Sequence, residues 1–287
     1  GTNSYGGFTQ WQLFRNPLYT LDSNFCSNGI LVNSIGIDFN TGWQPAGTWH
    51  QFIGPPHKNS NSNSEYVGTI SNGTTIINHG GRYGDMTITS SGTLTGEAVA
   101  TGAELHAIKG FSSSNYLRRE SQNFNFGSGS TLQLTLMGWV KVNTTSGYSY
   151  LCSVRDSSSG DSAGIAVHNN SGGIAGHVYA YDTNNQALFQ EPQGGTVANN
   201  EWHHICCIWD GRGGERRLYV NGRRVRVQTG ISNHPDFSAT STIAVGHWDD
   251  GNINHPNLGS ISLIKFTKGA PTDEQIYKIW CDERQMF

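Results

Sequence analysis

The sequence has few charged residues and lacks any long apolar run. Charged side chains make up 14% of its 287 residues, and the formal net charge at pH 7 is −3. That balance gives no broad positive field of the kind that favours nucleic-acid binding. No apolar segment approaches the roughly 18 residues that span a bilayer. We therefore expect neither a nucleic-acid partner nor membrane insertion.

Cysteine is scarce as well, and its placement does not suggest a disulfide framework. The cysteines are odd in number and form no C-x-x-C pair: Cys26, Cys152, Cys206, Cys207 and Cys281. Free cysteines are typical of buried positions and of a reducing compartment, so we expect the chain to fold in a cytoplasm. Neighbours on a strand face opposite ways, which should separate Cys206 from Cys207. For the same reason His203 and His204 should not chelate one ion.

What is abundant is glycine, serine, threonine and asparagine, with 37 glycines alone. This composition favours β-sheet with many turns. Residues 1–104 match no pattern we recognise, and we expect them to form a smaller β-rich domain, with a boundary near residues 92–102. Strand-like segments within it cover residues 30–39, 66–70, 74–78 and 86–89.

From residue 105 onward the strand pattern becomes regular. Apolar residues alternate along residues 132–142, which predicts a strand with one buried face, whereas the nearly continuous apolar run at 202–209 predicts a central strand buried on both faces. Asn221-Gly222 predicts a type I′ hairpin turn. Near the end, Thr272 and Gln275 form a capping-box pattern that predicts a short helix.

These segments carry recognisable signatures in order: GFSSSNYL, LTLMGWVKV, EWHHICCIWDG, RRLYVNGRRV, IAVGHW and PTDEQIYKIWCDERQMF. Together they resemble the concanavalin A-like (laminin G/pentraxin-type) jelly roll, with Asn221 where that pattern usually has Asp. The resemblance implies an all-β jelly-roll β-sandwich with a short C-terminal helix over residues 105–287, preceded by the smaller β-rich domain. The ending, with Asp282-Glu283 ahead of Phe287, looks like the tail common in phage-borne versions.

The resemblance implies a carbohydrate-binding, receptor-recognition module of a phage tail fibre or similar virion appendage. Such a module would be a homotrimer, would bind a bacterial surface polysaccharide, and would fold in the host cytoplasm. Glucanases of this fold carry E-x-D-x-x-E on one strand, and no such string occurs here, so we predict no catalytic residue. A polysaccharide depolymerase and a structural assembly domain without a sugar ligand remain the alternatives.

The first candidate ligand site is the loop after residue 247. It offers an aromatic face for a sugar beside oxygen ligands: Trp248, Asp249, Asp250, Asn252 and Asn254. Asp182 and Asn184 lie in another turn and are candidates for the same rim. Because calcium prefers oxygen ligands, Asp249, Asp250 and Asn252 are also a candidate calcium site.

The second candidate site is the outer face of the hairpin around Asn221. If the valines and Leu218 of this hairpin face the core, the alternate residues share the other face: Arg217, Tyr219, Arg224 and Arg226. Three guanidinium groups beside a phenol would suit an acidic polysaccharide or a neighbouring subunit.

Overall fold

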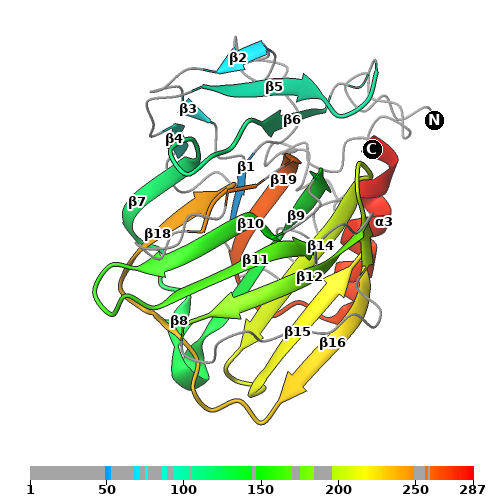
Figure 1. The fold of residues 1–287 in the computed structure, drawn as a ribbon. Helices are drawn as coiled ribbons and strands as arrows, with labels where there is room; N and C mark the ends of the chain where they lie inside the picture. The colour runs from blue at the N-terminus through cyan, green and yellow to red at the C-terminus, as the bar shows by residue number, and fades with distance from the viewer. Residues whose placement is uncertain are drawn as a thin grey trace, which may run out of the picture.

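Two antiparallel sheets pack face to face, and a C-terminal helix covers the outer side of one of them (Figure 1). The computed structural model describes residues 49–52, 68–70, 75–76, 86–88, 93–101, 103, 105–143, 147–169, 175–183, 196–248, 256–257 and 259–287. The predicted all-β sandwich with a short C-terminal helix is confirmed.

The first sheet runs in the order β16-β15-β14-β9-β19-β6-β5-β2, and β1 also pairs with β19. Every pairing among its described strands is antiparallel. Its strands are β1 (Trp49–Phe52), β2 (Gly68–Ile70), β5 (Leu94–Ala98), β6 (His106–Lys109), β9 (Gln133–Val142), β14 (His203–Asp210), β15 (Glu215–Val220), β16 (Arg223–Thr229) and β19 (Gly259–Lys268).

The second sheet runs in the order β13-β12-β11-β10-β18-β7-β4-β3, and a short separate pair joins β8 to β17. Its strands are β3 (Thr75–Ile76), β4 (Met86–Ile88), β7 (Leu117–Asn123), β10 (Gly147–Asp156), β11 (Ser162–Asn169), β12 (Ala175–Asp182), β13 (Thr196–Ala198) and β18 (Thr240–Val245). The remaining elements are β8 (Gly127–Ser128), η3 (Gly129–Thr131), β17 (Asp236–Phe237), α3 (Asp273–Glu283) and η4 (Arg284–Met286).

Strands that precede residue 105 belong to these same two sheets. β5 and β2 extend the first sheet beyond β6, while β4 and β3 extend the second beyond β7. Ile70 and Leu94 lie in the main core between the sheets. The strand segments predicted at 66–70, 74–78 and 86–89 contain β2, β3 and β4, and the one at 30–39 lies outside the described residues. The division at residue 104 stays a prediction.

The central strand β9 is buried on both faces, whereas the sequence predicted a strand with only one buried face. Its alternate residues Leu134, Leu136 and Val140 lie in the core between the sheets. Met137 and Trp139 face the other way, yet they too are almost fully buried. The covering layer is α3 with the C-terminal residues, which the strand's own pattern could not reveal.

The helix α3 begins with the predicted capping box. Thr272 Oγ1 accepts a hydrogen bond from the Gln275 backbone N–H at 3.3 Å, and Gln275 Oε1 accepts one from the Thr272 N–H at 2.8 Å. Ile276 and Ile279 are buried against the first sheet, and burial of each is worth about 1.5–3 kcal/mol. Within the described parts of the chain, the search for a helix of membrane-crossing length and hydropathy found none.

A bulge in β19 aims one charged side chain beneath this helix. The pairing with β9 shifts between Ser262 and Lys265, and Leu263 at the bulge has a positive φ of 50°. The extra residue inverts the alternation, so Lys265 pairs with Met137 on the outer face instead of pointing into the core. A Cβ at Gly138 would lie 2.4 Å from Ile264 Cδ1, and this close approach explains the glycine opposite the bulge.

The hairpin turn between β15 and β16 is confirmed. Asn221 and Gly222 have φ angles of 49° and 74°, as a type I′ turn requires. Asn221 also ties the turn to β14, because its Oδ1 accepts from the His204 N–H at 3.0 Å and its own N–H donates to the His204 carbonyl at 2.8 Å.

Candidate functional site

Trp248, the aromatic residue of the first predicted site, is buried instead of forming an open sugar platform. Only 1% of it is exposed, and its ring packs at 5.0 Å from that of Tyr150 and edge-on at 5.2 Å from that of Tyr181. Gly164 leaves room for it, since a Cβ there would lie 2.7 Å from the indole. The companion residues Asp249, Asp250, Asn252 and Asn254 lie outside the described residues, so the calcium site stays a prediction.

Asp182, predicted to share that rim, lies inside the sandwich. Its Oδ2 accepts a hydrogen bond from Trp209 Nε1 at 3.1 Å and pairs with Arg216 Nη2 at 2.9 Å, and both ion-pair side chains are fully buried. The expectation of a rim position is wrong for this residue because its charge is compensated internally. Asn184 lies outside the described residues.

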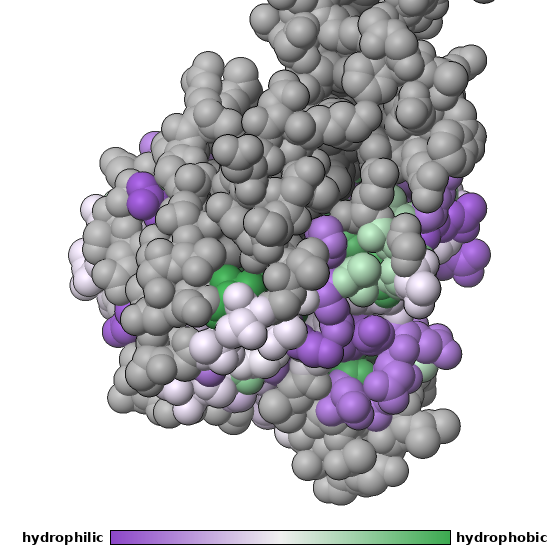
Figure 2. All heavy atoms as spheres, turned by 90° about the horizontal axis from the view of Figure 1, so that it is seen from above, coloured by the Kyte–Doolittle hydropathy of each residue, from purple (hydrophilic) through white to green (hydrophobic). Residues whose placement is uncertain are grey.

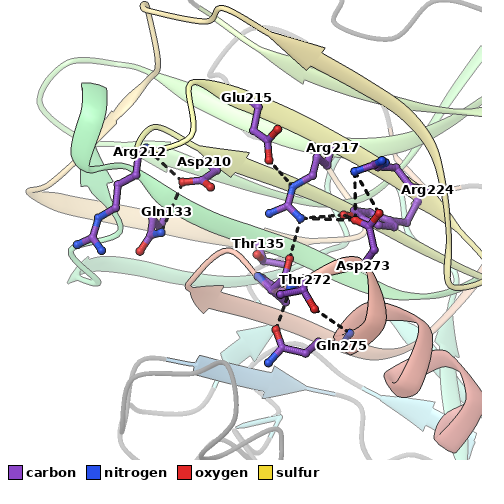
Figure 3. Close-up of polar contacts among 12 residues, drawn as sticks. Gln133, Thr135, Asp210, Arg212, Glu215, Arg217, Arg224, Thr272, Asp273 and Gln275 are labelled. Carbon is purple, nitrogen blue, oxygen red and sulfur yellow. Dashed lines mark hydrogen bonds and ion pairs between the residues drawn. The ribbon is translucent and has the colours of Figure 1, made fainter.

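The second predicted site is largely covered by α3 (Figure 3). Tyr219 is fully buried, and its hydroxyl donates to Asp273 Oδ1 at 2.7 Å. Arg217 is 7% exposed and lies between Glu215, at 3.0 Å, and Asp273, at 3.6 Å. Arg224 is more exposed and pairs with the same Asp273 at 3.1 Å. These three residues join the helix to the sheet.

Arg226 does not share their face, which corrects the prediction. The pairing of β15 with β16 shifts between Leu218 and Tyr219, so Leu218 pairs with Arg226 and Tyr219 pairs with Arg224. Directly paired residues lie on the same face, and the bulge therefore places Arg226 opposite to Arg224. Val227, predicted to face the core, is 42% exposed.

No group of three or more His, Cys, Asp or Glu side chains suited to a metal ion occurs among the described residues. His203 and His204 lie next to each other on β14 and point to opposite faces, as predicted. Cys206 and Cys207 are separated in the same way, one beneath α3 and the other in the main core. The cysteines within the described ranges are free, and Cys26 lies outside them.

A polar pocket of about 410 Å³ opens where β5, β6, β9 and β19 meet. We call it the amide pocket after its three asparagines. Figure 2, which looks onto the molecule from above the view of Figure 1, shows hydrophilic side chains gathered beside smaller hydrophobic areas on this face. The pocket is lined by Glu97, Lys109, Gly110, Phe111, Lys141, Asn143, Asn200, Asn257, Gly259 and Ser260.

Strand pairing assembles this pocket from distant parts of the chain. Ser260 at the start of β19 pairs with Lys141 on one side and with Lys109 on the other, which brings both ammonium groups to one place. Glu97 comes from β5, next to β6. Gly259 permits the close approach, since a Cβ on it would lie 2.0 Å from the Lys141 carbonyl oxygen.

The single carboxylate lining the described walls of the pocket is held in its ionised form. Burial alone would raise the pKa of Glu97, but hydrogen bonds from Lys109 and Ser260 and the nearby ammonium groups bring the pKa below its usual range. Ser260 Oγ donates to Glu97 Oε1 at 2.8 Å, and Lys109 forms an ion pair with Oε2. Lys141 lies over the Trp202 ring, with Nζ 5.3 Å from the ring centroid.

Asn257 contributes a buried hydrogen-bond donor that has no partner among the described residues. Its Oδ1 accepts from the Gly259 N–H at 2.8 Å, which fixes the orientation of the amide. Its Nδ2 is then left without a hydrogen-bond partner within the described structure, although the residue is only 1% exposed. An unpaired buried donor costs about 1–3 kcal/mol, so a ligand acceptor placed there would be stabilised.

Amides, ammonium groups and a hydroxyl are the donors and acceptors that can bond sugar hydroxyls, and the Phe111 side chain adds apolar surface. Sequence reasoning missed this pocket. One signal was present: Lys141 follows the apolar residues Met137 and Trp139 on the outer face of its strand.

Comparison with known families gives one match, which spans more than half of the chain. The family described as the concanavalin A-like lectin/glucanases superfamily matches residues 111–277. No curated protein matches the sequence.

Several solved structures are similar to the chain at low identity. Domain 4 of AbnA, an extracellular arabinanase from Geobacillus stearothermophilus solved with arabinotriose, is 18% identical, with coverage of 70% of this chain and 91% of that chain and a TM-score of 0.48. A heptameric SAP-like pentraxin from Limulus polyphemus is 16% identical, with 64% and 79% coverage and a TM-score of 0.40. A Trypanosoma rangeli sialidase mutant is 12% identical, with 81% and 34% coverage and a TM-score of 0.48.

Proposed function

Because the chain belongs to the concanavalin A-like lectin/glucanases superfamily, we propose that it is a carbohydrate-binding module that holds a glycan in the amide pocket without cleaving it. The observation that carries this proposal is the Asn257 amide donor, which has no hydrogen-bond partner among the described residues and belongs to a residue that lines an open polar pocket. Sugar hydroxyls both donate and accept hydrogen bonds, so they can satisfy an amide, an ammonium group and a hydroxyl together.

The charge state of Glu97 supports binding over hydrolysis. Glycoside hydrolysis uses two carboxyl groups, one of which must stay protonated to donate its proton. Glu97 is ion-paired to Lys109 and its pKa is lowered, which favours the ionised form at neutral pH. Within the described lining it has no second carboxylate beside it.

We further propose that the module is part of a phage tail fibre or similar virion appendage and recognises a bacterial surface polysaccharide. The resemblance of the C-terminal helix to phage-borne tails supports this setting, and so do the free cysteines in the described ranges, which suit folding in a host cytoplasm. A homotrimer would raise a weak single-site affinity through avidity.

The test is a screen of the purified protein against an array of bacterial polysaccharides, with calcium and with a chelator. We expect discrete binding that weakens about three- to tenfold in Asn143→Ala, which removes one exposed pocket amide. Gln285→Ala removes an exposed amide on η4 that does not line the pocket, and it should bind as the wild type does.

The same samples test the remaining parts of the proposal. Release of new reducing ends from a bound polysaccharide would favour the depolymerase alternative. A folded protein that binds no glycan would favour an assembly role. Light scattering that gives the mass of a single chain would contradict the homotrimer.

A further inference from the structure

The amide pocket carries a net positive charge that its internal ion pair does not cancel. Lys109 is paired with Glu97, which leaves the Lys141 ammonium as a second positive group beside a single carboxylate. Lys141 forms no ion pair with any described residue and lies instead over the Trp202 ring. Its charge acts on Glu97 from nearby, because it contributes to the lowered pKa of that carboxyl.

Asn257, on the same wall of the pocket as Lys141, also contributes a hydrogen-bond donor. Asn257 lines this wall, and because its Oδ1 accepts from the Gly259 N–H, its buried Nδ2 is left without a hydrogen-bond partner within the described structure. Gly259 pairs with Val142, the neighbour of Lys141, and Asn257 lies two residues before Gly259, so strand pairing brings the segment that carries Asn257 beside Lys141. A neutral hydroxyl could pair with one of them, but a carboxylate has two acceptor oxygens and a charge that matches the ammonium.

Resting on the proposed function, we propose that the amide pocket selects acidic saccharides, with a sugar carboxylate bound by Lys141 Nζ and Asn257 Nδ2. The sugar ring would lie along Phe111, and its hydroxyls would be bonded by Asn143 and Asn200. Asn200 is well fixed for this role, since its N–H donates to the Val142 carbonyl at 2.8 Å.

The experiment compares uronic-acid-containing bacterial polysaccharides with the same polymers after chemical reduction of their carboxyl groups. Affinity is measured by calorimetry at low and high salt. We expect the acidic forms to bind at least tenfold more tightly than the reduced forms, because hydrogen bonds to charged groups are stronger than those to neutral groups. Binding of the acidic forms should also weaken with added salt.

Variants at Lys141 and Asn257, with one control, locate the effect. Lys141→Gln should lose about tenfold in affinity for the acidic forms and little for the reduced ones, while Lys141→Arg should retain binding. Lys268→Gln makes the same change in net charge at the opposite end of β19 and serves as the matched control. Asn257→Asp keeps the acceptor for the Gly259 N–H but replaces the donor with a negative charge, and it should abolish the preference.

The possible outcomes distinguish a failure of the acidic preference from a failure of glycan binding itself. Equal binding of acidic and reduced polymers, with Lys141→Gln unchanged, would overturn the acidic preference and leave glycan binding intact. Binding of polymers that carry phosphate groups and no uronic acid as tightly as the uronic acids would overturn the assignment to a carboxylate. No binding to any polymer would overturn the glycan-binding function itself.

Discussion

Lys265 and Glu283 form an ion pair that solvent does not reach, between the bulged strand β19 and the end of α3. Trp139 Nε1 donates to the second carboxylate oxygen at 2.7 Å. Burial raises the pKa of Glu283, and the Lys265 ammonium together with these hydrogen bonds offsets part of that rise. The pair thus fixes the C-terminal helix to the sheet at a point where either charge alone would be costly.

Removing one partner of this pair should be worse than removing both. Lys265→Met leaves a buried carboxylate uncompensated and should lower the free energy of unfolding by about 3–5 kcal/mol. The double variant Lys265→Met/Glu283→Gln should recover part of that loss in urea unfolding. Lys278→Met breaks the exposed pair with Asp282 and, as a control, should cost about 0.5 kcal/mol or less. A double variant no more stable than Lys265→Met would contradict the buried-charge account.

Two glycines with the same backbone angle should respond differently to alanine. Gly222 and Gly230 both have a φ of 74°, but a Cβ at Gly222 would lie 2.9 Å from Trp280 Cβ, and one at Gly230 would meet nothing within 4 Å. Gly230→Ala should cost only the backbone strain, about 1 kcal/mol. Gly222→Ala adds a steric clash with α3 and should cost at least about 1 kcal/mol more. Equal urea midpoints for the two variants would show that α3 does not pack against the turn.

His204 should make the fold sensitive to acid. Burial, with a smaller effect of the Lys265 ammonium, lowers its pKa to about 3, compared with about 6.5 in an unfolded chain. The unfolded state therefore binds the proton first, so the stabilisation is complete above pH of about 6.5 and is lost as the pH falls toward about 3. Because neither ring nitrogen has a hydrogen-bond partner within the described structure, His204→Phe should fold. Its urea midpoint should fall less between pH 7 and 4.5 than that of the wild type, and parallel pH curves would exclude His204.

Asp273 should matter more than another ion-paired aspartate on the same helix. It accepts the Tyr219 hydroxyl and faces Arg217 and Arg224, and it lies in the first turn of α3, where a negative charge is favourable. Asp273→Ala should therefore cost about 1–3 kcal/mol of the free energy of unfolding. Asp282→Ala removes a pair within the helix surface and should cost about 0.5 kcal/mol or less. Similar losses of unfolding free energy in the two variants would mean that the contacts of Asp273 with the sheet add no stability.

Local patterns predicted the elements well because their causes are local. The type I′ turn follows from Asn221 and Gly222, and the start of α3 follows from Thr272 and Gln275. The faces of β16 were assigned wrongly because one bulge, beside Tyr219, reverses the alternation that the assignment assumed. A bulge has no reliable signature in an alternating apolar pattern.

The amide pocket was missed for a different reason. Glu97, Lys109, Lys141 and Asn257 come from segments that meet only through strand register, and Ser260 between the two lysines is what joins them. The predictions for Trp248 and Asp182 were also wrong, because they rested on residue type alone. Both residue types suit a sugar site, but the tyrosines that pack against Trp248 and the buried arginine that pairs with Asp182 were not visible in the sequence.

The strands that precede residue 105 bear on where the chain can be cut. If it began at residue 105, β6 and β7 would become bare edges whose N–H and C=O groups lose the partners that β5 and β4 supply. The main core would also lose Ile70 and Leu94, and Glu97 would be gone from the pocket. A fragment trimmed to residues 111–277, the part that matches the family, should therefore self-associate. The two sheets include strands that lie outside this range.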